Sequence, residues 1–579
     1  MIKRQIVLAA LFVCFFRLPS TAGDKLWQKE VDDDITFKKL HQAGVLIVGT
    51  DDTFYGFEPR TGKEIWKVED VAKSLVDKEM LVAMPPLTPY LIFEQEKGFM
   101  GSESIVRCID VTTGKTVWDM SNQAPEASAY RILEKKTDEL PEVRCRFLQK
   151  VGLDPAHNQL LLAFEMVNLF KGKAGKSGPE TFMGLVGVDV GTGKINFIFK
   201  LDDEPEGYYP WKGQYPPVIK GDVGMIDWAG YHSFSVLDGK PIVSLQFARG
   251  YKRGMLSRYI MEGTNAPMVV EGNIAYVVAK DQVIAVDTQT GKKKWESEEL
   301  DGALPEMHVV GNRIVLRMGG VFASGFGSSR EYKELKPYGV AILDKETGKK
   351  LSDTEKMNDD WEINSISPLL VDKSNVYFGT RNSVRAVDID KLQYKYNTDL
   401  GIEDGDMPRS VTMHDGQLIY LGEQMTAAIN PVNGEVLWKK YVEPPELDWG
   451  MAFARSFAKA VAAMDILSRT ATAAKEGGVS VLEEMDINQR IKEWNSFAAG
   501  FDAMSQRIAA LNTASQYNYV MAGETKDPEI LGISLTDGQQ VRKVKVMGRV
   551  PDYFVDEGDA ILVCVAKSDQ EILQVYSLK

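Results

Sequence analysis

The residue types that could carry out chemistry are present in this chain, but their spacing matches no common catalytic or ligand-binding pattern. The stretch GKAGKSG at 172–178 contains the Gly-Lys-Ser of a phosphate-binding loop, yet Phe170 occupies the position where that loop needs its first glycine. The five histidines are isolated, with neither a His-x-His nor a His-Glu-x-x-His spacing, so the sequence does not support a zinc site. We therefore expect no catalytic residue, no cofactor and no metal ligand.

Aromatic side chains suggest a second kind of chemistry. Tyr208, Tyr209 and Trp211 lie close together in EGYYPWKGQYP, and such rings can stack on sugars. They can equally pack between strands, which is the interpretation that we favour. Binding of a glycan or another polymer is thus an alternative function.

The stretch AVDTQTGKKKW, residues 285–295, indicates the elements that position the side chains. One strand ends at Val286, Asp287 can accept main-chain N–H groups across a turn, and Gly291 tolerates the positive φ that such a turn needs. The returning strand brings in Trp295, a large apolar side chain that can pack against a neighbouring sheet. The motif therefore predicts a β-hairpin with an aromatic anchor.

Copies of this hairpin recur along nearly the whole chain. The copies that begin at 56, 108, 187 and 428 end in Trp66, Trp118, Phe197 and Trp438, and weaker copies begin at 236, 342, 386 and 532. Apolar runs between the turns supply further strands, so each copy predicts a four-stranded unit. A repeat of this length indicates an all-β fold, a closed β-propeller, and we expect eight to ten blades.

The two ends of the chain predict how the ring closes. The chain ends on the strand EILQVYSLK without a returning partner, and DKLWQKEV from Asp24 is a lone strand with Trp27 at the fourth-strand position. If both strands share one blade, an exposed sheet edge is removed. The predicted structural anchors of the repeats are Trp27, Trp66, Trp118, Asp287, Gly291, Trp295 and Trp438.

One segment interrupts the β pattern. Between 447 and 515, apolar residues recur at steps of three and four in two runs separated by Gly477 and Gly478, which predicts an inserted αα-hairpin. Its two apolar stripes pack on each other and on the propeller, or they dock onto a partner. The candidate partner-binding residues are Phe453, Phe457, Trp494 and Phe501. Two further insertions, 168–184 and 318–337, are rich in glycine and are expected to be surface loops.

The N-terminus has the organisation of a signal peptide. Lys3 and Arg4 precede an apolar run at 6–16, and small residues at 20–22 predict cleavage before Gly23. The apolar run is too short to span a membrane. The predicted organisation is therefore a leader at 1–22, the first part of the propeller at 23–446, the helical insertion at 447–515, and the last blades with ring closure at 516–579.

Export places the mature protein in the periplasm or outside the cell. Cys14 lacks the small preceding residue that lipid attachment needs, so a lipid anchor is not favoured. Cys108 and Cys145 could form a disulfide in such a compartment, although buried thiols are the interpretation that we favour. With 68 Lys and Arg, 82 Asp and Glu and a net charge of −14, the chain has no basic footprint for nucleic acid.

The A-x-D-x-x-T-G-K-x-x-W copies resemble the repeats of quinoprotein β-propellers, the pyrroloquinoline-quinone-like repeat superfamily. The match is complete at 285–295 and extends over the mature chain apart from 447–515. In the quinone-dependent alcohol dehydrogenases of this superfamily, adjacent cysteines, a calcium site and a catalytic aspartate support the reaction. This sequence has no adjacent cysteines, so the resemblance implies the fold and not that cofactor.

A second branch of the superfamily consists of the non-catalytic propeller subunits of the outer-membrane β-barrel assembly machinery. The present chain is longer and has the extra insertion. The expected function is nevertheless an exported, non-enzymatic scaffold that binds a protein or peptide, as a monomer or in a hetero-complex, in envelope or outer-membrane protein assembly. A divergent quinone-dependent oxidoreductase is the alternative.

Overall fold

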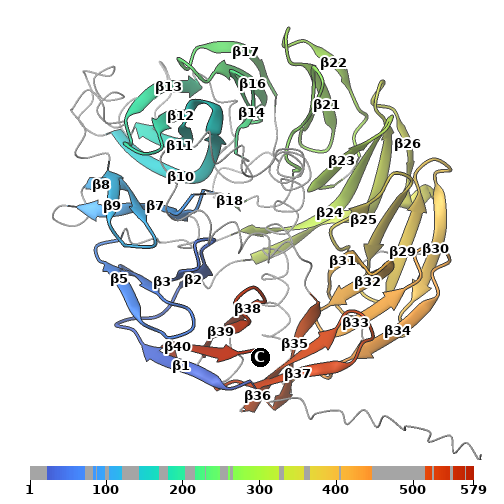
Figure 1. Ribbon diagram of the computed structural model, residues 1–579. Helices are drawn as coiled ribbons and strands as arrows, with labels where there is room; N and C mark the ends of the chain where they lie inside the picture. The colour runs from blue at the N-terminus through green and yellow to red at the C-terminus, as the bar shows by residue number, and fades with distance from the viewer. Residues whose placement is uncertain are drawn as a thin grey trace, which may run out of the picture.

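Ten antiparallel β-sheets surround a common centre and form the blades of a propeller (Figure 1). In eight of them four strands follow one another in chain order, and the fourth strand lies at the rim. The sheet at the chain ends takes its fourth strand from the N-terminus, and one sheet has three strands among the described residues. The computed structural model describes residues 23–71, 82–85, 88–97, 103–119, 143–168, 180–201, 216–228, 230–247, 259–260, 265–300, 302–324, 331–357, 366–402, 406–445, 516–524, 527–547, 552–566 and 569–578.

We number the blades in chain order, beginning with the sheet that both ends of the chain share. Blade 1 contains β38 (Asp552–Asp556), β39 (Ile561–Ala566), β40 (Asp569–Ser577) and β1 (Lys25–Glu30). Blade 2 contains β2 (Phe37–Leu40), β3 (Leu46–Gly49), β4 (Phe54–Phe57) and β5 (Glu64–Val68). Blade 3 contains β6 (Val82–Ala83), β7 (Tyr90–Lys97), β8 (Glu103–Asp110) and β9 (Thr116–Asp119). Blade 4 contains β10 (Val143–Asp154), β11 (Gln159–Asn168), β12 (Glu180–Asp189) and β13 (Ile195–Leu201). Blade 5 contains β14 (Val218–Lys220), β15 (Val223–Ile226), β16 (Gly230–Ser235) and β17 (Pro241–Gln246).

The second half of the ring continues in the same way. Blade 6 contains β19 (Val269–Glu271), β20 (Ile274–Val278), β21 (Val283–Asp287) and β22 (Lys293–Glu296). Blade 7 contains β23 (Glu306–Val310), β24 (Arg313–Ser324), β25 (Glu331–Asp344) and β26 (Lys350–Asp353), with β18 (Tyr259–Ile260) paired to β24. Blade 8 contains β27 (Leu370–Val371), β28 (Asn375–Gly379), β29 (Ser383–Asp388) and β30 (Gln393–Asp399). Blade 9 contains β31 (Pro408–His414), β32 (Gln417–Gly422), β33 (Met425–Ile429) and β34 (Val436–Tyr441). Blade 10 contains β35 (Tyr517–Glu524), β36 (Asp527–Ser534) and β37 (Gln540–Lys545).

The ends of the chain meet in blade 1. The strand β1 pairs antiparallel with β40, and Trp27 lies opposite Val575. In Figure 1 the first strand of the chain, in blue, lies beside the last, in red. The N-terminal strand thus forms the fourth strand of the blade that the C-terminus begins, and the ring is closed.

The hydrophobic core lies between the blades. One cluster joins Val48 and Phe57 of blade 2 to Val563 and Val575 of blade 1. Most strands in the middle of a blade are apolar on both sides, since each blade has a neighbour on either face. Cys108 and Cys564 are buried as free thiols, and burial raises the pKa of the Cys108 thiol.

The structure corrects one expectation about loops. Most of 318–337 is not a loop, because β24 continues to Ser324 and β25 begins at Glu331, so the two strands form a long hairpin. Likewise, β12 already begins at Glu180, inside the stretch 168–184. Within the described ranges, helix is confined to η2 (Pro155–His157) and α2 (Thr354–Met357). The leader and the helical insertion predicted at 447–515 lie outside the described residues.

Candidate functional site

The junctions between blades use one repeated contact, an indole hydrogen bond to the next blade. The fourth-strand tryptophan of one blade donates its N–H to a carbonyl oxygen in the turn between the third and fourth strands of the next blade. The five pairs are Trp27 to Pro59 at 2.9 Å, Trp66 to Val111 at 2.6 Å, Trp118 to Val190 at 3.1 Å, Trp295 to Lys345 at 3.1 Å and Trp438 to Thr536 at 3.2 Å. The indole N–H therefore meets its hydrogen-bonding requirement while the ring stays packed.

A glycine in each of these turns makes room for the indole. A Cβ at Gly193 would lie 2.6 Å from Cγ of Trp118, and Gly193 has a φ of +68°. Both the contact and the backbone angle exclude a side chain at this position. The register of the two strands shifts at the same turn, as between Gly187 and Val188, which is the signature of a bulge next to a turn.

The turn aspartate organises the main chain on the other side of the glycine. Asp287 Oδ1 accepts hydrogen bonds from Thr290 N at 2.8 Å and Thr290 Oγ1 at 2.9 Å, and from Gln289 N at 3.1 Å. The main-chain and side-chain hydrogen bonds from Thr290 lower the pKa of Asp287. Gly291 follows with a φ of +68°, and its nitrogen donates to Asp287 O at 2.8 Å. Asp287 thus accepts the hydrogen bonds that hold its own turn.

Junctions without a tryptophan were not recognised from the sequence. In blade 8, Tyr396 lies against Gly434 of blade 9, and Thr398 Oγ1 donates to Gly434 O at 2.6 Å. In blade 5, Val243 lies against Gly291 of blade 6. Val243 and Tyr396 occupy the same position in the fourth strand, counted from the turn, as the tryptophans of the other blades. A search for that position, without regard to residue type, would have identified both.

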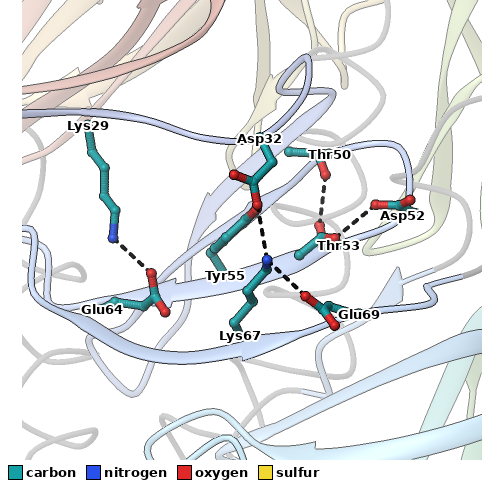
Figure 2. Close-up of polar contacts among 9 residues, drawn as sticks. All are labelled: Lys29, Asp32, Thr50, Asp52, Thr53, Tyr55, Glu64, Lys67 and Glu69. Carbon is teal, nitrogen blue, oxygen red and sulfur yellow. Dashed lines mark hydrogen bonds and ion pairs between the residues drawn. The ribbon is translucent and has the colours of Figure 1, made fainter.

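The seam between blade 1 and blade 2 carries a group of charged and aromatic side chains at the surface (Figure 2). Lys29 Nζ contacts Glu64 at 2.8 Å, and Lys67 Nζ contacts Asp32 at 3.0 Å and Glu69 at 2.9 Å. Exposed pairs of this kind each contribute little to stability. Their arrangement ties the N-terminal strand to the blade that follows it.

Aromatic rings lie beneath these lysines. Tyr55 donates its hydroxyl proton to Asp32 Oδ2 at 3.0 Å, Lys67 lies 5.6 Å from the centre of the Tyr55 ring, and Lys29 lies 4.6 Å from that of Phe57. Hydrogen bonds from Lys67 and Tyr55 lower the pKa of Asp32. The seam therefore combines cation–π, aromatic and ionic contacts.

A buried polar cluster joins blade 7 to blade 8. Glu306 is 2% exposed and contacts His308 Nε2 at 2.8 Å and Arg317 Nε at 2.9 Å. The main-chain nitrogen of Leu369, next to blade 8, donates to both carboxylate oxygens at 3.0 and 3.1 Å. Burial disfavours the charged form of Glu306, but the hydrogen bond and charge of His308, the charge of Arg317 and the Leu369 N–H outweigh it and lower the pKa. Sequence reasoning missed this cluster because Arg317 lies in the neighbouring strand β24 and Leu369 lies 63 residues further along the chain, next to blade 8.

The remaining candidate residues cannot be placed. Phe453, Phe457, Trp494 and Phe501 all lie outside the described residues, as do Tyr208, Tyr209 and Trp211. Within the described part of the chain, no group of three or more His, Cys, Asp or Glu side chains is arranged to hold a metal ion. In that same part, no helix has the length and apolar character needed to cross a membrane.

The fold and its junctions define the class of the protein as a ten-bladed β-propeller of pyrroloquinoline-quinone-like repeats. The family model described as outer membrane protein assembly factor BamB matches residues 16–140 and 238–440, which is more than half of the chain, and the chain belongs to this family. No curated protein matches the sequence significantly.

Two solved structures illustrate the similarity. BamB from Moraxella catarrhalis is 11% identical, and the match covers 72% of this chain and 100% of that one with a TM-score of 0.35. The quinohemoprotein alcohol dehydrogenase ADHIIG from Pseudomonas putida HK5 is also 11% identical, and the match covers 96% of this chain and 76% of that one with a TM-score of 0.30. Membership of the family rests on the family model.

Proposed function

We propose that this protein is an exported, non-catalytic scaffold that binds a protein or peptide partner during the assembly of outer-membrane proteins. The observation that carries the proposal is the match of more than half of the chain to the outer membrane protein assembly factor family. The signal-peptide pattern of residues 1–22 supports export to the periplasm or beyond.

The use of the repeated residues is consistent with a scaffold. Trp66 and Trp118 bind the next blade, Asp287 binds its own turn, and Glu306 is enclosed between two blades. These contacts maintain the ring. Partner binding therefore falls to parts of the chain that do not repeat, of which 447–515 is the longest and the richest in apolar stripes.

The proposal is tested in a strain that lacks the gene. Deletion should lower the amount of folded β-barrel proteins in the outer-membrane fraction, measured by heat-modifiable mobility on gels. The full chain should restore it, and a chain with Phe453→Ala, Phe457→Ala and Trp494→Ala should not. A matched control, Ile65→Ala, alters an exposed apolar residue in a rim strand of blade 2 and should restore it fully.

Two results would contradict the proposal. One is an unchanged outer-membrane protein fraction in the deletion strain. The other is reduction of an electron-accepting dye by the purified protein with an alcohol, only when pyrroloquinoline quinone and calcium are added, which would favour the dehydrogenase alternative. Export is checked separately by N-terminal sequencing of the mature protein, which should begin at Gly23.

A further inference from the structure

The junction between blade 5 and blade 6 replaces the tryptophan contact with a different set of side chains. The tryptophan position lies four residues after the turn glycine, and in blade 5, counted from Gly239, it is held by Val243. Val243 still packs on the next blade, because a Cβ on Gly291 would lie 2.1 Å from Val243 Cγ1. A valine side chain has no N–H, so it cannot make the hydrogen bond that the indole makes elsewhere.

The third strand of blade 5, β16, brings two hydroxyl groups to the same face of the sheet. Ser233 pairs directly with Val243, and Tyr231 pairs with Leu245. Side chains two residues apart on a strand point to the same side, so both hydroxyls share the face of Val243. Tyr231, Val243 and Leu245 pack in one cluster with buried residues of β20 and β21 in blade 6. This face is therefore the one that blade 6 covers.

Blade 2 shows what lies at these positions when the tryptophan is present. Ser233 corresponds to Gly56, since each lies six residues before its turn glycine and pairs with the tryptophan position of its own blade. A Cβ on Gly56 would lie 2.4 Å from Nε1 of Trp66. The side chain of Ser233 therefore lies beside the place that the indole N–H takes in blade 2. Tyr231 corresponds to Phe54 and adds a hydroxyl that blade 2 lacks.

Both hydroxyl groups are enclosed in the protein. Tyr231 and Ser233 are each 0% exposed. Burial raises the pKa of Tyr231 to about 12, while the Ser233 hydroxyl lowers it and the charge of Asp287 raises it, so Tyr231 Oη lies near both Ser233 and the turn of blade 6. Among the residues that the structure describes, neither Tyr231 Oη nor Ser233 Oγ has a hydrogen-bond partner. Buried hydroxyls are normally hydrogen-bonded, either to protein or to ordered water.

The turn of blade 6 supplies an acceptor for this junction. Four of the carbonyls that accept an indole N–H belong to the residue three positions before a turn glycine: Pro59, Val111, Val190 and Lys345. In blade 6 the corresponding residue is Thr288, three positions before Gly291. Thr288 follows Asp287, whose charge acts on Tyr231. Two hydroxyls and one carbonyl match the roughly three hydrogen bonds that a buried water molecule makes.

We propose that the junction between blades 5 and 6 binds one structural water molecule, which bridges Tyr231 Oη and Ser233 Oγ and donates to Thr288 O. The water molecule takes the role that the indole N–H has at the tryptophan junctions. Because apolar side chains of both blades surround the two hydroxyls, the water exchanges slowly with the solvent. This inference does not depend on the proposed function.

The first experiment counts slowly exchanging water molecules in the full chain by oxygen-17 magnetic relaxation dispersion. The variant Tyr231→Phe with Ser233→Ala removes both hydroxyls and leaves apolar walls, which do not retain a water molecule. We expect one slowly exchanging water fewer than in the unmodified protein. The unfolding midpoint should not rise, because the hydroxyls were hydrogen-bonded through the water.

Tyr420→Phe is the matched control for this measurement. Tyr420 is also 0% exposed, but its hydroxyl donates to Thr380 O at 3.1 Å. This substitution should lower the unfolding midpoint and leave the number of slowly exchanging waters unchanged. The proposal is overturned if the double variant keeps the same number of waters. It is also overturned if the midpoint of the double variant rises, because the two hydroxyls were then buried without any partner.

A second variant restores the residue pair of blade 2 at the same junction. In Ser233→Gly with Val243→Trp, the new indole should donate to Thr288 O and displace the water. The folded variant should therefore also hold one slowly exchanging water fewer than the unmodified protein. An unchanged number would show that no water lies where the indole enters, and the proposal would be wrong.

Discussion

Trp66 represents the residue-scale contact that recurs between blades. It is 7% exposed, and its indole N–H donates to Val111 O at 2.6 Å. Trp66→Ala should lower the free energy of unfolding by about 3–5 kcal/mol, because it removes a large buried side chain. Trp66→Phe keeps much of the packing and loses the hydrogen bond, so a smaller loss is expected. Chemical denaturation measures both, and equal losses for the two variants would contradict this account.

Glycine in the turns is required to different degrees. Gly193 and Gly416 have similar positive φ values of +68° and +75°, but only Gly193 lies against an indole, whereas a Cβ at Gly416 would meet nothing within 4 Å. Gly416→Ala should therefore cost about 1 kcal/mol from the backbone angle alone. Gly193→Ala should cost clearly more in the same denaturation experiment. A similar cost for both would mean that the indole moves aside freely.

Glu306 makes stability depend on pH at one buried junction. Its pKa in the folded protein lies below the ordinary value of 4.5. The contribution of the ionised carboxylate is therefore fully present above about pH 4.5 and is lost as the pH falls through the lowered folded pKa. Thermal unfolding between about pH 5 and 2 should show this loss.

The matched variant for this prediction is Glu306→Gln. It keeps the shape of the side chain but leaves Arg317 and His308 without their carboxylate, so it should be destabilised by about 3–5 kcal/mol near neutral pH. Its unfolding midpoint should vary less with pH than that of the unmodified protein over the same range. An identical pH dependence for both proteins would assign the acid sensitivity to other groups.

Local residue patterns predicted the turn side chains but not this cluster. Asp287, Gly291 and Trp295 interact within one hairpin or with an adjacent repeat, so their spacing in sequence reports their structural role. Glu306 and Leu369 are 63 residues apart, and nothing in their local sequence relates them. A contact between strands of different blades becomes visible only when the fold has placed them.

At the scale of elements, β1 determines whether the ring is closed. Deleting residues 23–30 removes Trp27 and exposes the edge of β40, which otherwise pairs from residue 572 to 576. Because unpaired edges promote association between chains, the truncated protein should form concentration-dependent oligomers, measured by size-exclusion chromatography with light scattering. A strictly monomeric truncated protein would show that β40 is protected in another way.

The prediction of strands and loops was less successful where a glycine-rich composition indicated a loop but the residues pair as strands. The glycine content of 318–337 indicated a loop, yet β24 and β25 pair through it with a register shift between Met318 and Gly320. Glycine tolerates such irregularities within a strand, so its frequency alone does not distinguish a loop from a bulged hairpin. Residues such as Tyr332 and Val321, which favour strands, were the better indicator.

For the whole molecule, closure predicts cooperative unfolding. Every blade is packed on both faces, so the loss of one blade exposes the core of two others. Thermal unfolding monitored by circular dichroism and by tryptophan fluorescence should therefore give one coincident transition. In the protein without residues 23–30, the transition seen by circular dichroism and that seen by tryptophan fluorescence should occur at different temperatures, because blades 1 and 2 can then unfold first. Coincident transitions in both proteins would argue against this coupling.

The number of blades could be bounded but not fixed from sequence. The copies beginning at 236 and 386 lack the tryptophan and part of the turn, and still each lies where the third strand of a four-stranded blade turns into the fourth. In the second of these, Leu392 adopts a φ of +56° at the position of the glycine. Packing on both sides thus maintains a blade whose own signature is weak.

The pairing of β1 with β40 also reverses the order of synthesis and assembly. The strand that emerges first from the ribosome is placed last, since its partner is made more than 500 residues later. Until then β1 and Trp27 have no partner strand in blade 1, and the incomplete ring of blades has an unpaired edge at each end. A chain whose synthesis is incomplete therefore keeps an unpaired N-terminal strand and exposed apolar surface until β40 is made, and its yield depends on how well that strand is protected from association with other chains.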